Sequence, residues 1–263
     1  MSHQFYVTLP SDSSFAYYSD NTAAKYITKL TEELSLDGSY EVGLAEICYT
    51  KSLFNFDNSK GHHWLEVRAA RTGKLTKCTF RSGFYATTED FVNDLNKQMD
   101  DTFGKNENYK ISFQVDKTSG LIALSLYKKH DYIITFEWSE PFQRLIGYGA
   151  EYWPPNESGL YPASKRLDLN DGLRFMYVYC DIVSHTLVGD TKAPLLRVFP
   201  LRGNYGDVIQ ETFNDIHYVP VQKRHFDSIE LSINTETGQI MPFQFGKSIV
   251  TLHFRRTYSI PEK

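Results

Sequence analysis

The sequence predicts a mainly β protein, an antiparallel sandwich or jelly roll that carries a small α+β insertion. Short runs in which apolar and polar residues alternate recur in both the N-terminal and the C-terminal parts of the chain, which is the pattern of half-buried strands. Turn segments containing Gly and Asn or Asp separate several of these runs. Aromatic residues make up 15% of the 263 residues, and Tyr and Phe favour strands over helices.

The C-terminal third carries the clearest strand patterns. Residues 249–255 alternate strictly, so Leu252 is predicted to face the core of a central strand and Thr251 the opposite side. Residues 229–233 alternate in the same way, and Asn234–Gly238 then supplies a turn. Further strands are predicted at 5–9, 40–44, 195–199 and 216–221, whereas 24–34 fits either a strand or a helix.

Residues 175–182 form a run that is apolar on both faces. Met176 and Val178 share one face, while Tyr177 and Tyr179 share the other. A sandwich strand needs only one apolar face, so the second face is expected to be covered. The cover can come from the insertion, from the Pro-rich segment 152–162, or from a neighbouring subunit, and the last of these predicts self-association.

The middle of the chain has a different pattern. Thr87 and the acidic residues that follow it predict the start of a helix, which Gly104 is expected to end. Alternating strands are predicted to follow at 111–115, 122–126 and 132–136.

Polar or Pro- and Gly-rich stretches border this middle block at 55–61 and 147–162. We therefore expect residues 59–151 to form an α+β insertion domain. The flanking pieces, 1–58 and 152–263, are expected to form the sandwich together, because neither alone holds enough strands for two sheets.

The charge and the motifs argue against several function classes. The net charge is −4, which is not the basic excess of a protein that binds nucleic-acid phosphates. The sequence contains no phosphate-binding, nucleophile-elbow or zinc-protease motif. His62 and His63 are adjacent, so their side chains point apart in a strand. His217, His225 and His253 are too scattered for a metal site and are expected at strand surfaces. No catalytic, cofactor-binding or metal-binding residue is therefore predicted, and we do not expect an enzyme.

The cysteines and the chain ends bear on the compartment. Cys48, Cys78 and Cys180 lie far apart and include no CxxC pair, so we expect three reduced thiols. The N-terminal residues lack the pattern of a signal peptide, and no run of 18 apolar residues occurs. We expect a product that is cytosolic or nuclear when made, without membrane insertion, in which the sequon Asn156–Ser158 is unused.

A set of segments, in order along the chain, points to a known family. They are Phe5–Ser14, Tyr40–Ile47, Phe91–Asn96, Leu145–Tyr148, Tyr218–Val221, Phe226–Ile229, Gly238–Phe243 and Leu252–Arg255. Together they resemble the minor capsid (penton) proteins of Polinton/Maverick elements and adintovirus-like viruses, which are relatives of the virophages. One departure is that Tyr49-Thr50 and Leu53 stand where a Tyr-Pro pair and then a Trp are expected.

The resemblance implies a structural protein of the virion. It implies a single jelly roll that forms homopentamers at the vertices of an icosahedral capsid, beside a major capsid protein with a double jelly roll. No cofactor and no specific nucleic acid are implied.

A second function remains open from the residues themselves. The aromatic-rich insertion is also compatible with an attachment module that binds a host receptor or a glycan. In that case exposed aromatic side chains stack on sugar rings. The candidates are Trp138, Tyr152 and Trp153.

Overall fold

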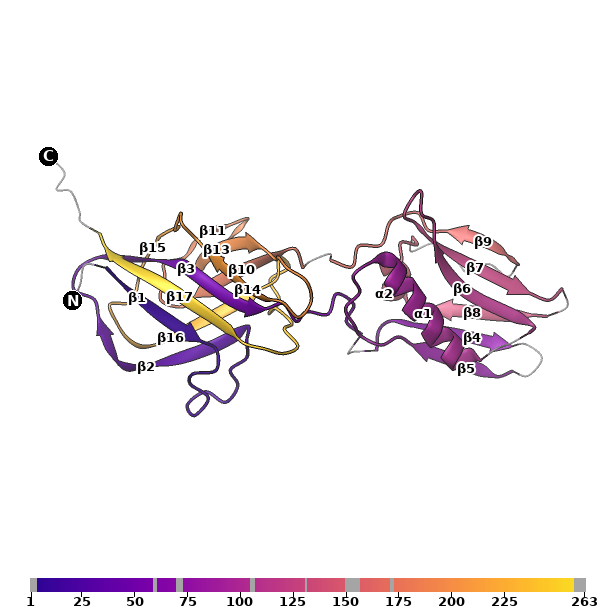
Figure 1. Cartoon of the computed structure of the whole chain (residues 1–263), viewed down its shortest axis with the longest axis horizontal. Helices are drawn as coiled ribbons and strands as arrows, with labels where there is room; N and C mark the ends of the chain where they lie inside the picture. Colours follow the sequence, from indigo (N-terminus) through magenta and orange to yellow (C-terminus); the bar gives the residue numbers. More distant parts are fainter. Residues whose placement is uncertain are drawn as a thin grey trace. The chain divides into compact units, whose positions relative to one another are not determined.

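The computed structural model describes residues 4–58, 61–69, 73–104, 107–130, 132–149, 157–170 and 173–257. The chain divides into two compact units (Figure 1). Unit 1 combines residues 1–53 with 171–263, and unit 2 consists of residues 54–170.

Unit 1 is a sandwich of two antiparallel sheets. Sheet A holds, in spatial order, β1 (Gln4–Pro10), β17 (Ser248–Arg256), β3 (Tyr40–Thr50) and β14 (Val208–Thr212), with β15 (Val219–Pro220) also beside β3. Sheet B holds β13 (Leu195–Pro200), β10 (Phe175–Cys180), β16 (His225–Asn234) and β2 (Lys25–Ser35). A short hairpin, β11 (Thr186–Val188) and β12 (Thr191–Ala193), connects β10 to β13.

The strand order identifies the sandwich as a jelly roll. When the eight long strands of unit 1 are numbered one to eight in chain order, their spatial order is 1-8-3-6 in sheet A and 5-4-7-2 in sheet B. This interleaving of first and last strands in two four-stranded sheets is the double Greek key of a jelly roll. Because β1 pairs with β17, and β2 with β16, the two outer pieces of the chain do meet in space, as predicted.

The core of unit 1 lies between the two sheets. Val250, Leu252 and Phe254 have no exposed surface, and β17 lies between β1 and β3, which confirms the predicted central strand. Residues 25–35 form a strand, which settles the segment that also fitted a helix. The strand predicted at 216–221 is shorter than expected, because only Val219 and Pro220 pair with β3.

Unit 2 has two three-stranded sheets and two helices in its described residues. One sheet has the order β5 (Leu75–Thr79), β4 (Trp64–Ala69), β8 (Ile134–Trp138), and the other has the order β6 (Tyr109–Val115), β7 (Ile122–Lys128), β9 (Gly159–Pro162). The helices are α1 (Thr88–Phe103) and α2 (Glu140–Leu145).

The predicted ends of α1 are confirmed. The Thr87 hydroxyl accepts a hydrogen bond of 3.0 Å from the Asp90 N–H, and Gly104 follows the helix with a φ of 70°. The apolar side of α1, which includes Phe91 and Leu95, is buried in the core of unit 2. The sequence prediction missed α2 and the strands β4, β5 and β9, and β8 begins at Ile134, two residues later than expected.

The borders of unit 2 differ from the expected 59 and 151, and two contacts explain the difference. Phe56 is buried and lies edge-on to Phe91 of α1, with ring centroids 5.2 Å apart. At the other end, β9 pairs with β7 over residues 159–162. Residues before 59 and after 151 therefore contribute to the core and the sheet of unit 2.

Candidate assembly surfaces

The outer side of sheet B is apolar in the half formed by β10 and β13. Three cross-strand pairs, Phe175 with Pro200, Tyr177 with Val198 and Tyr179 with Leu195, place their side chains there, and we call these six residues the apolar face. Phe175 and Val198 remain 40% and 37% exposed, and both tyrosines are half-buried. Partial burial raises the pKa of the Tyr179 phenol. Within the described residues, the predicted second face of this strand is therefore only partly covered.

The other half of the same side is polar. Lys25 of β2 lies 3.5 Å from the carboxylate of Glu230 on β16, and Lys29 pairs with Asp227. Such exposed ion pairs are solvated and contribute little to stability. The apolar face is therefore a bounded patch next to the β13 edge of the sheet.

The connection from β1 to β2, residues 11–24, carries a second group of exposed aromatic side chains. Phe15 is 49% exposed and Tyr17 is 73% exposed, the second highest value among the large apolar side chains of the described residues. The connection, which we call the aromatic loop, is nevertheless held in place. The buried hydroxyl of Ser14 accepts a hydrogen bond of 3.0 Å from the Lys29 N–H. The Asn21 side chain accepts a hydrogen bond from the Ile27 N–H and donates one to the Ile27 carbonyl, both at 2.9 Å.

The aromatic loop also forms one wall of an open groove of about 600 Å³ on the outer side of sheet A. Cys48 and Ile249, which pair across β3 and β17, line the groove, and so do Phe15 and Val208 of β14. Val208 is 71% exposed, so this end of sheet A is also apolar.

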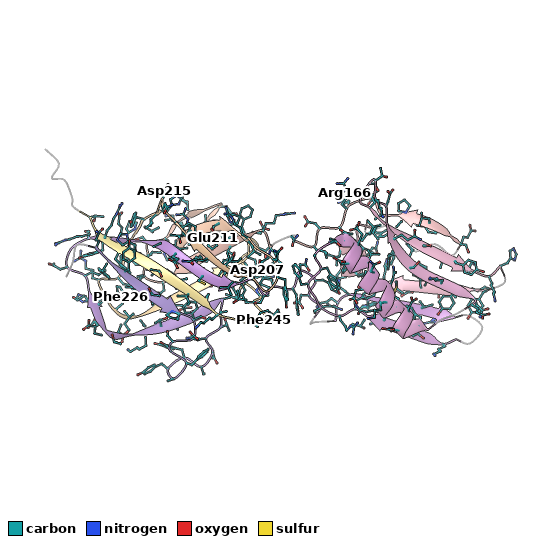
Figure 2. The ribbon with its side chains drawn as sticks, viewed as in Figure 1. Arg166, Asp207, Glu211, Asp215, Phe226 and Phe245 are labelled. Atoms are coloured by element: carbon teal, nitrogen blue, oxygen red, sulfur yellow. The ribbon has the colours of Figure 1, made fainter. Side chains whose placement is uncertain are left out.

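Hydrogen bonds join the connections at one end of the jelly roll, which we call the tied end. The buried Ser52 hydroxyl donates a hydrogen bond to the carbonyl of Phe245, and the Ser248 hydroxyl donates to the carbonyl of Ala23 at 2.6 Å. The Lys51 N–H donates to the Asp207 carbonyl. Figure 2 shows Asp207 and Phe245 at this end, and Asp215 toward the other end.

A cluster of rings and charges covers part of the outer side of sheet A. The His253 ring stacks on Tyr6, with centroids 4.4 Å apart, and its Nδ1 lies 2.7 Å from the Tyr218 hydroxyl. The guanidinium of Arg255 lies 3.5 Å from the centre of the Tyr218 ring and pairs with Glu41. Burial and the nearby Arg255 lower the pKa of His253.

The segment that carries Tyr218 crosses the sheet at Gly43. A Cβ at residue 43 would lie 2.3 Å from Ile216 Cγ2 and 2.5 Å from the His217 carbonyl oxygen, so only glycine allows this approach. The sequence argument placed His253 at an open strand surface, and this is wrong: the crossing segment leaves the residue 7% exposed.

The other singled-out residues do not converge on a site. His62 is exposed, whereas His63 is half-buried, its ring 5.0 Å from that of Phe56, and burial lowers its pKa. His217 and His225 are exposed. Across the described ranges no group of three or more His, Cys, Asp or Glu side chains is placed to hold a metal ion, and no helix is both long and apolar enough to cross a membrane.

The aromatic candidates for glycan binding have different positions. Trp138 is 8% exposed and donates a hydrogen bond of 3.0 Å to Gln143, so it belongs to the core of unit 2 and is not available to a sugar. Tyr152, Trp153 and Asn156 of the sequon lie outside the described residues.

Sequence reasoning missed Phe15 and Tyr17 as surface residues. The available signal was the run Phe15-Ala16-Tyr17-Tyr18 between serines, which fits neither the strand nor the helix period and so has no face to bury.

No family model and no curated protein matches the chain. Among solved structures, the mavirus penton protein aligns over 97% of this chain and 99% of its own, with 12% identity and a TM-score of 0.48. The Sputnik virophage structure aligns over 96% of this chain and 98% of its own, with 9% identity and a TM-score of 0.43. The assignment of unit 1 to the jelly rolls rests on the order of its own strands.

Proposed function

We propose that this chain is a structural minor capsid protein, a penton, which forms a homopentamer at the vertices of an icosahedral virion beside a major capsid protein with a double jelly roll. The number five and the major capsid partner come from the resemblance of the sequence segments to the penton family. In this role the chain has no catalytic step.

The observation that carries the proposal is the apolar face on a jelly-roll frame. Viral capsid subunits are one of the protein classes built on this frame. A monomer in solution gains nothing from Phe175 and Val198 exposed on the same face of the sheet, whereas a subunit contact removes both from water. Tyr and Phe suit such contacts, because they bury a large area with few rotatable bonds.

Light scattering after size exclusion tests the oligomer. A mass of about five times the 30.4 kDa of the chain supports the pentamer, either alone or after co-expression with the major capsid protein of the same element. Electron microscopy of the co-expressed particles should then show the chain at the vertices. A monomer at every concentration that also fails to join particles excludes the penton role.

A second function, attachment to a host surface, has one observation in its favour. The outer side of the β6–β7–β9 sheet exposes Tyr127 (55%) and Leu160 (59%), next to the hydroxyls of Ser112 and Ser125. An aromatic ring beside hydroxyl groups is compatible with glycan contact. The test compares binding of the full chain and of Tyr127→Ser to a glycan array and to cells. Equal binding by both proteins, or binding by neither, excludes this face as the attachment site.

A further inference from the structure

We propose that the subunits of the ring meet head to tail, with the aromatic loop of one copy packed on the apolar face of the next. This inference rests on the penton function proposed above and names the two surfaces that make the contact. The occupant of the apolar face is thus a second copy of this chain.

The positions of the two surfaces in unit 1 are the first argument. β1 and β2 form one lateral edge of the sandwich, since the Tyr26 hydroxyl donates a hydrogen bond of 3.0 Å to the carbonyl of Leu9. β13 and β14 are the edge strands on the opposite side. The aromatic loop follows the first edge and the apolar face adjoins the second (Figure 1), so one copy presents both halves of a contact in opposite directions. This is the arrangement of a heterologous interface.

The height of the two surfaces along the strands is the second argument. The aromatic loop lies at the tied end of the jelly roll, because Ser248 bonds to Ala23. The apolar face begins at the end where β10 starts and β13 stops, since the Leu201 N–H donates to the Arg174 carbonyl at 2.8 Å. β10 starts shortly after the chain re-enters unit 1 at residue 171, and β13 is followed by the connection that contains Asp207. Asp207 belongs to the tied end (Figure 2), so the aromatic loop and the apolar face lie at the same end of the jelly roll. Surfaces at one height are joined by a rotation without a shift, which closes a ring rather than a filament.

Charge is the third argument. Residues 11–24 contain Asp12 and Asp20 and no Lys or Arg. Arg174 and Arg202 lie in the segments that border the apolar face. Arg197 of β13 points to the other side of that strand, where its guanidinium lies 4.0 Å from the centre of the Phe213 ring. Asp12 is paired with Lys247 within the chain, and Arg202 lies 3.7 Å from Glu211, so Asp20 is the acidic group best placed to approach a neighbour. Opposite charges at the rim of an apolar contact fix its orientation.

The first experiment uses one charged substitution on each surface of the full chain. Tyr17→Glu alters the loop and Val198→Glu alters the apolar face; both side chains are exposed, so the folded chain tolerates the change. Leu187→Glu is the matched control, because Leu187 is 78% exposed on the β11–β12 hairpin and belongs to neither the aromatic loop nor the apolar face. We expect Tyr17→Glu and Val198→Glu to raise the concentration for half-assembly at least tenfold and Leu187→Glu to leave it unchanged. Pro200→Glu, at an exposed position of the same face, replaces Val198→Glu if that variant unfolds.

The second experiment mixes the two interface variants. A Val198→Glu subunit keeps an intact loop, and a Tyr17→Glu subunit keeps an intact apolar face. A head-to-tail contact therefore predicts that the mixture forms a one-to-one pair of twice the chain mass and nothing larger, while each variant alone stays monomeric. If rings form only on capsids, the same variants are scored by incorporation into particles made with the major capsid protein.

The outcomes separate this inference from the proposed function. Full pentamers from either interface variant overturn the assigned surfaces while the penton role stands, and so does a mixture that stays monomeric where the unaltered chain forms rings in solution. Where rings form only on capsids, incorporation of either variant at the level of the unaltered chain has the same meaning. An unaltered chain that neither forms rings nor joins particles overturns both.

Discussion

The Tyr26 hydroxyl of sheet B donates a hydrogen bond of 3.0 Å to the carbonyl of Leu9 in sheet A, and both residues are almost completely buried. This bond connects the two sheets at the β1–β2 edge, and burial raises the pKa of the Tyr26 phenol. The edge beneath the aromatic loop is thus closed by a polar contact in an apolar environment, where an unpaired carbonyl is costly.

Tyr26→Phe removes the donor and leaves the Leu9 carbonyl without it. Because Leu9 also pairs with Val250 of β17, its carbonyl is not left without a partner, and we expect the free energy of unfolding of the jelly roll to fall by about 0.5–1.5 kcal/mol, the usual net contribution of a hydrogen bond. Urea unfolding followed by fluorescence measures the change. Tyr218→Phe is the control in a less buried position, and a loss for Tyr26→Phe no greater than for Tyr218→Phe would mean that the inter-sheet bond contributes little.

Leu252→Asp should unfold unit 1 or nearly do so. It places a carboxylate at a fully buried position of the central strand β17, at a cost of several kcal/mol, which is comparable to the stability of a domain. Thr251→Asp changes the neighbouring outward position, opposite Glu46, and should cost about 1 kcal/mol or less. Thermal unfolding compares the two, and similar melting temperatures would contradict the register of β17.

The residues themselves show why some of this structure could be predicted and some could not. The strand around Leu252 and the helix after Thr87 follow from local patterns, because alternation and helix capping depend only on residues that are close in the sequence. The strand β9 is four residues long and has no alternation of its own, and it exists because it pairs with β7. The burial of Trp138 could not be predicted for the same reason, since it depends on contacts with Phe113 and Phe142 that sequence periodicity does not indicate.

The candidate surfaces divide in the same way. The two-sided apolar pattern of residues 175–182 predicted a second apolar face that needs a cover, and within the described residues Phe175 on that face is still 40% exposed. The burial of His253 was not predictable, because its cover is a connection that passes over Gly43 from a distant part of the sequence. The aromatic loop went unnoticed because exposure of a ring such as Tyr17 depends on how the connection folds along β2.

A fragment of residues 54–170 should fold by itself and unfold cooperatively. The shorter fragment 59–151 lacks Phe56 and β9, so it should be clearly less stable, because a buried aromatic side chain alone contributes about 3–5 kcal/mol. Circular dichroism during thermal unfolding tests both. Equal stability of the two fragments would show that the borders at 59 and 151 were adequate.

The jelly roll should also remain soluble when residues 54–170 are replaced by a short Gly/Ser linker. The sheet pairings of unit 1 are formed entirely by residues on either side of this segment. A deletion protein that is insoluble under conditions in which the full chain is soluble would show that the two units depend on each other for folding.

The stability of unit 1 should depend on pH through His253. Its pKa is lowered in the folded chain, so the unfolded chain binds the proton more readily. The contribution of the neutral ring is therefore complete above the ordinary histidine pKa of about 6.5 and is lost as the pH falls through the folded value. The groups that face the ring are Arg255, which opposes protonation, and the phenols of Tyr6 and Tyr218.

His253→Gln isolates this effect. The unaltered chain should lose more stability to urea than the variant does when the buffer changes from about pH 7.5 to about pH 5.5. Because the pKa of His63 is lowered too, the comparison is made on unit 1 with residues 54–170 replaced, or with His63→Gln in both proteins. Parallel losses in the variant and the unaltered chain would assign the acid sensitivity to other groups.

The insertion lies between the third and the fourth strand of the jelly roll, and it leaves the sheet pairings of unit 1 to the flanking residues. The segment 54–170 can therefore be exchanged in one genetic step, by recombination at two points, without altering the register of a single jelly-roll strand. Homologous chains should accordingly differ more in the sequence and length of this segment than in unit 1. The same property makes these two points suitable for grafting a foreign domain, which a pentameric ring would present in five copies.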